Sequence, residues 1–176
     1  MIHCIICFWM MRLLFKLMLS LCSVCIRCIL LILLMPPLIV HEMGHLLLAL
    51  AFRFPVQSFN IGSAGEILFQ SFLGNISFKV YNKIDGAGVI INFTEKAYPK
   101  WQLVAVLSAG WCMNLLIALV CFFIITNTIG LVYGVINLFF VILSIWPNRG
   151  NDGYCCYELL RGRIPSSWLE KQDNYM

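Results

Sequence analysis

The sequence is poor in charged residues. Only 11% of its 176 residues are Asp, Glu, Lys or Arg, whereas 61% are hydrophobic. A soluble domain has roughly a quarter charged residues, so this composition excludes an ordinary soluble protein. The formal net charge of +4 is small and scattered along the chain, which excludes the concentrated basic surface that nucleic acid requires. We therefore expect an integral membrane protein that binds no nucleic acid.

The nine cysteines do not form the pattern of an extracellular disulfide framework. Cys22, Cys25 and Cys28 are spaced as C-x-x-C-x-x-C, a pattern that a metal or iron–sulfur site could use. The triplet lies in an apolar run that predicts a helix, without polar residues to support bound ligands. Because free cysteine packs as a small hydrophobic residue, the sequence favours buried structural thiols.

One polar cluster interrupts the most apolar part of the chain. From Cys28 to Phe52 the only formal charge is Glu42, within the run His41-Glu42-Met43-Gly44-His45. Histidines at positions i and i+4 share one face of a helix, so both rings can reach one metal ion. The glutamate between them is placed to take a proton from a bound water, as in the H-E-x-x-H motif of zinc proteases. An acid in hydrocarbon is costly, which predicts a function or a partner for it.

Four apolar segments have about the length that a membrane span requires. They are Ile5–Ile26, Cys28–Phe52, Trp101–Thr126 and Ile129–Pro147. The first carries Arg12 and Lys16, so it is a span, an interfacial helix or a tilted anchor. In the second, Pro36-Pro37 predicts a kink or a helix start just before the histidines, with freed backbone carbonyls. Only Asn127 and Thr128 separate the last two segments, which predicts a tight helical hairpin.

Residues 53–100 form a polar insert between the second and third spans. Alternation over Ile76–Tyr81 and the turn residues Asp85-Gly86 predict the short strands of a β-hairpin. Lysines and arginines lie both in the insert and in the tail after Pro147, which places both on the cytoplasmic side. The uncharged turn at Asn127–Thr128 then faces outward.

A catalytic zinc ion usually has three protein ligands, so the two histidines need a third. Asp152 is the first candidate, because the motif helix and the last span both end at the cytoplasmic face. Glu66 and Asp85 in the insert remain alternatives, although solvated loop charges are the commoner explanation for such residues.

Gly110 and Asn114 form a second polar feature, in the third span. The glycine permits close helix approach, and the amide offers a hydrogen-bond donor inside an apolar helix. Asn114 either fixes helix packing through an interhelical hydrogen bond or contacts a substrate, and the residues alone favour neither role.

These three motifs in this order resemble the site-2 protease family of intramembrane zinc metalloproteases. The resemblance rests on HEMGH in one span, G-x-x-x-N in a later span and Asp-Gly after the last span, and it covers about residues 28–155. It implies that His41, His45 and Asp152 bind Zn²⁺ and that Glu42 is the catalytic general base. It further implies that Asn114 is a catalytic residue that positions the substrate or stabilises the oxyanion.

The sequence departs from the family pattern at three positions. Trp111 stands where proline is frequent, Ser144 stands where asparagine is common, and Tyr154 replaces a second glycine after Asp152. None of these departures removes a candidate metal ligand. The insert is also too short to hold a PDZ domain.

The expected fold is an all-α polytopic membrane protein. It has three core transmembrane helices, an N-terminal hydrophobic helix and a small insert that the resemblance makes a membrane-associated β-hairpin. The expected organisation is an N-terminal hydrophobic helix at 1–27, an intramembrane metalloprotease core at 28–155 with the insert at 53–100, and a cytoplasmic tail at 156–176.

The expected function is that of a zinc metalloendopeptidase within the membrane. It hydrolyses peptide bonds of a transmembrane or membrane-inserted peptide substrate through a zinc-activated water, with Glu42 as the general base. Its expected surroundings are the lipid bilayer of a cell membrane, crossed several times, most simply a prokaryotic cytoplasmic membrane with the active site toward the cytoplasm. The alternative is a non-catalytic zinc-binding accessory, immunity or transport protein.

Overall fold

The computed structural model describes residues 2–3, 24–62, 64–84, 86–91, 98–125, 127–146, 148 and 151–163. The helices among them are α2 (Val24–Ala51), α3 (Lys100–Phe123), α4 (Thr128–Ile145) and α5 (Asp152–Leu160). The strands are β1 (Ile2–His3), β2 (Val56–Ile61), β3 (Ala64–Leu73), β4 (Ile76–Lys83) and β5 (Ala87–Ile91). The predicted N-terminal helix falls almost entirely outside these residues.

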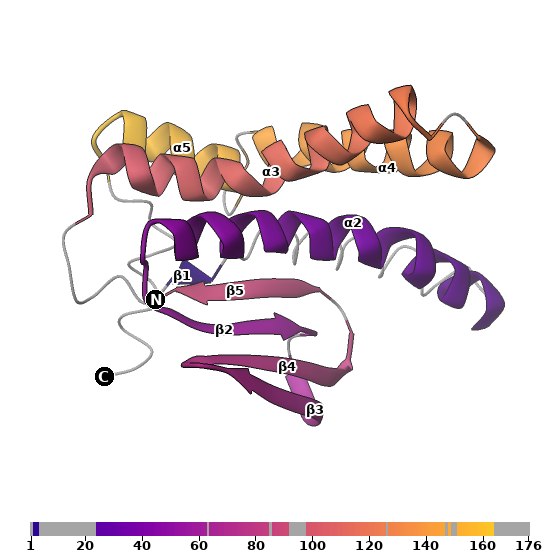
Figure 1. Ribbon diagram of the computed structural model, residues 1–176, viewed down its shortest axis with the longest axis horizontal. Coiled ribbons are helices and arrows are strands. Elements are labelled where there is room, and N and C mark those ends of the chain that lie inside the picture. The colour runs from indigo at the N-terminus through magenta and orange to yellow at the C-terminus, as the bar shows by residue number, and fades with distance from the viewer. Residues whose placement is uncertain are drawn as a thin grey trace.

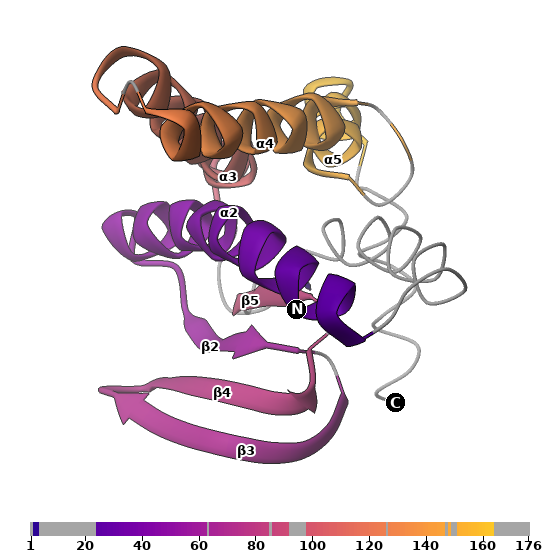
Figure 2. The ribbon, with the colours of Figure 1, turned by 90° about the vertical axis from the view of Figure 1, so that its right-hand side faces the viewer.

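Helix α2 forms the middle layer of the molecule. The helices α3, α4 and α5 lie on one side of α2 and the β-sheet lies on the other (Figures 1 and 2). Leu46 of α2, Val89 of β5 and Val106 of α3 belong to one buried apolar cluster that joins the three layers. The HEMGH run is therefore enclosed from two sides.

Three helices are long and apolar enough to cross a membrane. They are the parts Ile29–Ala51 of α2, Lys100–Phe123 of α3 and Thr128–Ile145 of α4. They match the three core spans that the sequence predicted. Large apolar side chains such as Phe123, Leu131 and Ile142 point outward, as suits helices surrounded by lipid.

Pro36 and Pro37 lie inside α2 and do not begin it. Proline has no N–H, so Pro36 leaves the carbonyl oxygen of Ile32 without its usual helical donor. The hydroxyl of Tyr133 in α4 donates to that oxygen at 3.1 Å. The hydrogen bond from Tyr133 replaces the missing helical donor at Ile32 and links α2 to α4.

The prediction of an all-α fold is wrong, because the insert forms four strands of a mixed β-sheet, to which β1 adds a fifth. Its strand order is β1-β5-β2-β4-β3. Strand β2 is parallel to β4 and antiparallel to β5, so it lies between them. The predicted hairpin across Asp85-Gly86 is therefore also wrong, and Asp85 itself lies outside the described residues. The actual hairpin joins β3 to β4 at Gly74, whose φ of 59° suits glycine.

The sequence pattern predicts some of the strands more clearly than others. Alternation predicts a strand only when one face is buried and the other is polar. Strand β3 exposes apolar side chains on both faces, for example Leu68 and Phe69, so it shows no such pattern. Strand β2 follows α2 almost directly and buries Val56 and Phe59 against it. The sheet is therefore stabilised by packing against α2, which the alternation of polar and apolar residues within a strand does not predict.

Candidate metal centre

Helices α2 and α5 bring together three side chains that could bind a metal ion. Nε2 of His41 lies 3.0 Å from Oδ2 of Asp152, and Nε2 of His45 lies 3.3 Å from the same oxygen. The two Nε2 atoms are 3.1 Å apart. All three side chains are buried, and their ligand atoms lie within 4.8 Å of one another. Three donors converging from two helices could hold one metal ion.

The second ring nitrogens of both histidines face polar atoms of α3. Nδ1 of His45 donates to the carbonyl oxygen of Val106 at 2.7 Å, so Nε2 is the ring nitrogen that faces the centre. Nδ1 of His41 lies 3.4 Å from Nδ2 of Asn114. Such outer contacts orient ligating imidazoles, so α3 determines how the two rings face the centre.

Two glycines let the backbones of α2 and α3 approach closely at the centre. A Cβ at Gly110 would come within 2.6 Å of Nε2 of His41 and closer still to Nε2 of His45. A Cβ at Gly44 would collide with the carbonyl oxygen of Ala109. Gly110 thus keeps free the space beside the two donor nitrogens. Two imidazoles and one carboxylate are a donor set that fits a zinc site with three protein ligands.

Glu42 is buried beside the three candidate ligands. Its side chain is 0% exposed, and neither carboxylate oxygen has a hydrogen-bond partner among the described residues. The backbone N–H of Val89 in β5 is near the carboxylate but not in hydrogen-bonding geometry. A buried carboxylate without a partner is costly, which fits a group that acts on a water or a substrate.

Asp152 begins α5, beyond the end of the last span. Burial raises the pKa of its carboxyl group, but the charge of His45 and hydrogen bonds from both imidazoles lower it more strongly. The pKa therefore lies below its ordinary value, and the side chain is an anion. An anionic oxygen beside two imidazole nitrogens is a suitable donor set for a divalent cation.

The structure brings together the three residues that the sequence predicted as ligands, and it places Glu42 and Asn114 beside them. Their roles stay predictions. Glu66, an alternative third ligand, is exposed on β3. Sequence reasoning missed two supporting groups. One is the carbonyl of Val106, which accepts from His45, and the other is the side chain of Asn151, which donates to carbonyl oxygens at the end of α4. No local signal marks a backbone acceptor, whereas an asparagine just before Asp-Gly could have been noticed.

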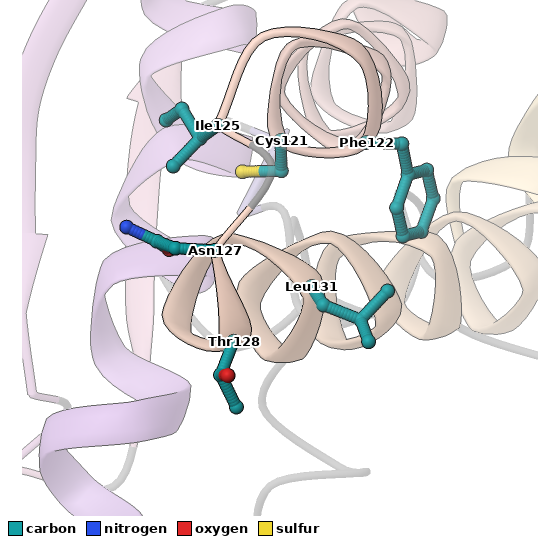
Figure 3. A pocket seen from close by; sticks show the side chains of 6 residues that line it. All are labelled: Cys121, Phe122, Ile125, Asn127, Thr128 and Leu131. Carbon is teal, nitrogen blue, oxygen red and sulfur yellow. The ribbon is translucent and has the colours of Figure 1, made fainter.

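A cavity of about 250 Å³ lies at the connection between α3 and α4. Neither the three candidate ligands nor Glu42 and Asn114 line it. Figure 3 shows the six side chains that line it, which are Cys121, Phe122, Ile125, Asn127, Thr128 and Leu131. It is therefore separate from the candidate metal centre.

Comparison with known proteins identifies the family. The model of peptidase family M50 matches residues 29–171, which include the HEMGH run, α3, α4 and Asp152. No curated protein matches the chain.

Proposed function

Since the chain belongs to peptidase family M50, the site-2 protease family of metallopeptidases, we propose that it is an intramembrane zinc metalloprotease. Its substrate is a membrane-embedded protein or peptide, in which it hydrolyses peptide bonds. The observation that carries this proposal is the convergence of His41, His45 and Asp152 beside the buried, unpartnered carboxylate of Glu42.

His41, His45 and Asp152 would hold the zinc ion. When bound there, Zn²⁺ acts as a Lewis acid that activates water and polarises a scissile carbonyl. The contact of His45 with Val106 keeps that ring in the tautomer that binds through Nε2. A side chain at Gly110 would collide with both Nε2 atoms, so glycine keeps side-chain atoms away from the candidate ligands on the α3 side.

Glu42 is the general base of the proposed reaction. It takes a proton from the attacking water and later delivers it to the nitrogen of the leaving amine, so the two steps use one carboxylate. A site that only held zinc for structural reasons would need no base between its ligands, and it would normally have four protein ligands.

Asn114 can serve both the candidate ligand and the substrate. As placed, Nδ2 faces His41 and Oδ1 has no partner among the described residues. Rotating the carboxamide by half a turn lets Oδ1 accept a hydrogen bond from Nδ1–H of His41. Nδ2 is then free to donate to the oxyanion of the substrate, which is the role that the family resemblance implies.

The substrate is proposed to bind as an added strand along β5. One edge of β5 pairs with β2, and the other pairs with β1 at Ile90 and Ile91. In the described part of the chain, no strand pairs with the outer edge of Ala87–Val89. Because Val89 lies near Glu42, a segment added there would pass close to the base. Strand pairing also keeps the substrate unwound, which exposes its carbonyl groups.

The family and the three apolar helices indicate a membrane protein. We propose that it crosses a prokaryotic cytoplasmic membrane several times, with the metal centre toward the cytoplasm. Arg53 follows α2, Lys100 begins α3 and Arg161 follows α5. A Cβ at Gly162 would lie 3.4 Å from Nζ of Lys100, so the start of α3 and the end of α5 meet. Positive charge gathered at one end of the spans favours the cytoplasmic side.

Metal removal tests the proposed activity. The full chain is reconstituted in liposomes with a transmembrane reporter peptide, and cleavage is followed by gel electrophoresis. A strong chelator is expected to abolish cleavage, because the water loses its activating ion, and added Zn²⁺ is expected to restore it. Cleavage that persists in the chelated, zinc-free protein would exclude a zinc protease. Zinc binding with no cleavage of any reporter would instead indicate the non-catalytic accessory.

A further inference from the structure

The residue before Asp152 makes an unusual set of contacts. Asn151 occupies the N-cap position of α5, yet its side chain makes no capping hydrogen bond to that helix. An N-cap asparagine normally accepts a hydrogen bond from the first turn of its own helix. Here Nδ2 donates instead to the carbonyl oxygens of Leu143 at 2.7 Å and Trp146 at 3.3 Å. The side chain therefore ties the start of α5 to the end of α4.

The residue after Asp152 contacts the same part of α4. A Cβ at Gly153 would collide with the carbonyl oxygen of Ile145 and would lie 2.9 Å from that of Ser144. The first turn of α5 thus lies directly on the last turn of α4. Asp152 is held between these two contacts, and its own carboxylate points to the histidines of α2.

The backbone around Asn151 is also held on both sides. Its N–H donates to the carbonyl oxygen of Asn148 at 2.9 Å, and its carbonyl oxygen accepts from the N–H of Cys155 at 3.0 Å. The side chain is only 6% exposed, so water does not readily replace a lost hydrogen bond. A substitution at Asn151 should therefore shift the position of the next residue, Asp152.

We infer that Asn151 is a positioning residue, which holds the Asp152 carboxylate at the metal centre through the last carbonyls of α4. The inference rests on the proposed function, in that Asp152 binds zinc. A ligand needs its place to within about 0.5 Å, and the contacts of Asn151 with α4 fix the backbone directly before Asp152. The loss of the Asn151 hydrogen bonds lowers the affinity for zinc more than it lowers overall stability.

The test compares zinc affinities of purified full-length variants in detergent, by competition with a chromophoric chelator. Serine is a good N-cap residue but too short to reach Leu143, so Asn151→Ser removes the tie without removing capping ability. We expect its zinc affinity to fall by about 10- to 100-fold, the range for lost outer-shell contacts. The matched control is Asn127→Ala, because Oδ1 of Asn127 caps the other end of α4 by accepting from the N–H of Gly130 at 2.8 Å. This control should lower the melting temperature and leave zinc affinity unchanged.

The outcomes separate the inference from the proposed function. Wild-type protein that binds no zinc would overturn the proposed function itself. Wild-type affinity in Asn151→Ser would overturn the inference alone, as would an equal loss of affinity in both variants, which would reflect general stability. If Asn151→Ser does not fold, Asn151→Asp decides, because it keeps the shape and lacks the donor. The added negative charge of Asn151→Asp would by itself favour binding of a cation. Weakened zinc binding by this variant would therefore support the role of the Asn151 hydrogen bonds to α4, and wild-type zinc binding would contradict it.

Discussion

Replacing Gly110 by alanine is expected to abolish zinc binding, and with it all cleavage. The added methyl group would collide with Nε2 of both His41 and His45, the atoms that would bind the ion. The flanking backbones of α2 and α3 are already in contact at Gly44, so the helices have little freedom to separate. The metal content of the purified variant, measured by atomic emission, is expected to fall to background.

Gly134→Ala is the matched control for this prediction. Gly134 is also a glycine in a membrane-spanning helix, and a Cβ there would come within 2.6 Å of the ring of Phe122. It perturbs the packing of α4 against α3 without touching the candidate ligands. This variant should keep its zinc. Normal zinc content in Gly110→Ala would show that the ion binds elsewhere, whereas zinc loss in both variants would point to general misfolding.

Glu42→Gln is expected to keep zinc and to lose catalysis. Glutamine has the shape of glutamate but cannot take a proton from water, and general-base catalysis contributes about 10²- to 10⁴-fold to a rate. We expect kcat for the reporter peptide to fall by about that factor, with the zinc content of the wild type. The melting temperature should not fall, because an amide is less costly to bury without a partner than a carboxylate.

The combination of measurements makes this second prediction specific. Full cleavage by Glu42→Gln would remove Glu42 from the mechanism. Loss of zinc together with activity would mean that the carboxylate is a metal ligand instead of a base. Only retained zinc with lost activity agrees with the role proposed for this residue.

Much of the candidate site could be predicted from the sequence because its signals are local or topological. The i and i+4 spacing of His41 and His45 places both rings on one helix face whatever the surrounding fold. Asp152 followed from counting spans, because an even number of crossings returns the chain to the same membrane face. The three spans themselves followed from apolar length, which the bilayer thickness dictates.

The sheet could not be predicted in the same way. Its parallel pairing of β2 with β4 joins segments separated by the β3 strand, and no local pattern specifies such a partner. The sequence showed one alternating strand and one turn, which a hairpin explains equally well. Strand β5 packs against α2 through buried residues such as Val89, a long-range contact that no local pattern reveals.

The supporting contacts of the centre were also beyond the sequence. Gly110 was expected to allow close helix approach, but only the structure shows that it faces the two imidazoles. The sequence pattern indicated no role for Asn151, and its hydrogen bonds to α4 depend on how α4 and α5 pack against each other. Residue type suggests which groups can do chemistry, whereas tertiary packing decides which groups hold them in place.

The most direct test of the account is the zinc content of purified wild-type protein, His45→Ala, Asp152→Ala and Glu66→Ala. Glu66 is the control, because it is an exposed acid of the sheet that sequence reasoning left as an alternative ligand. We predict about one zinc ion per chain in the wild type and in Glu66→Ala, and none in the other two variants. Full zinc content in Asp152→Ala would contradict the proposed metal centre.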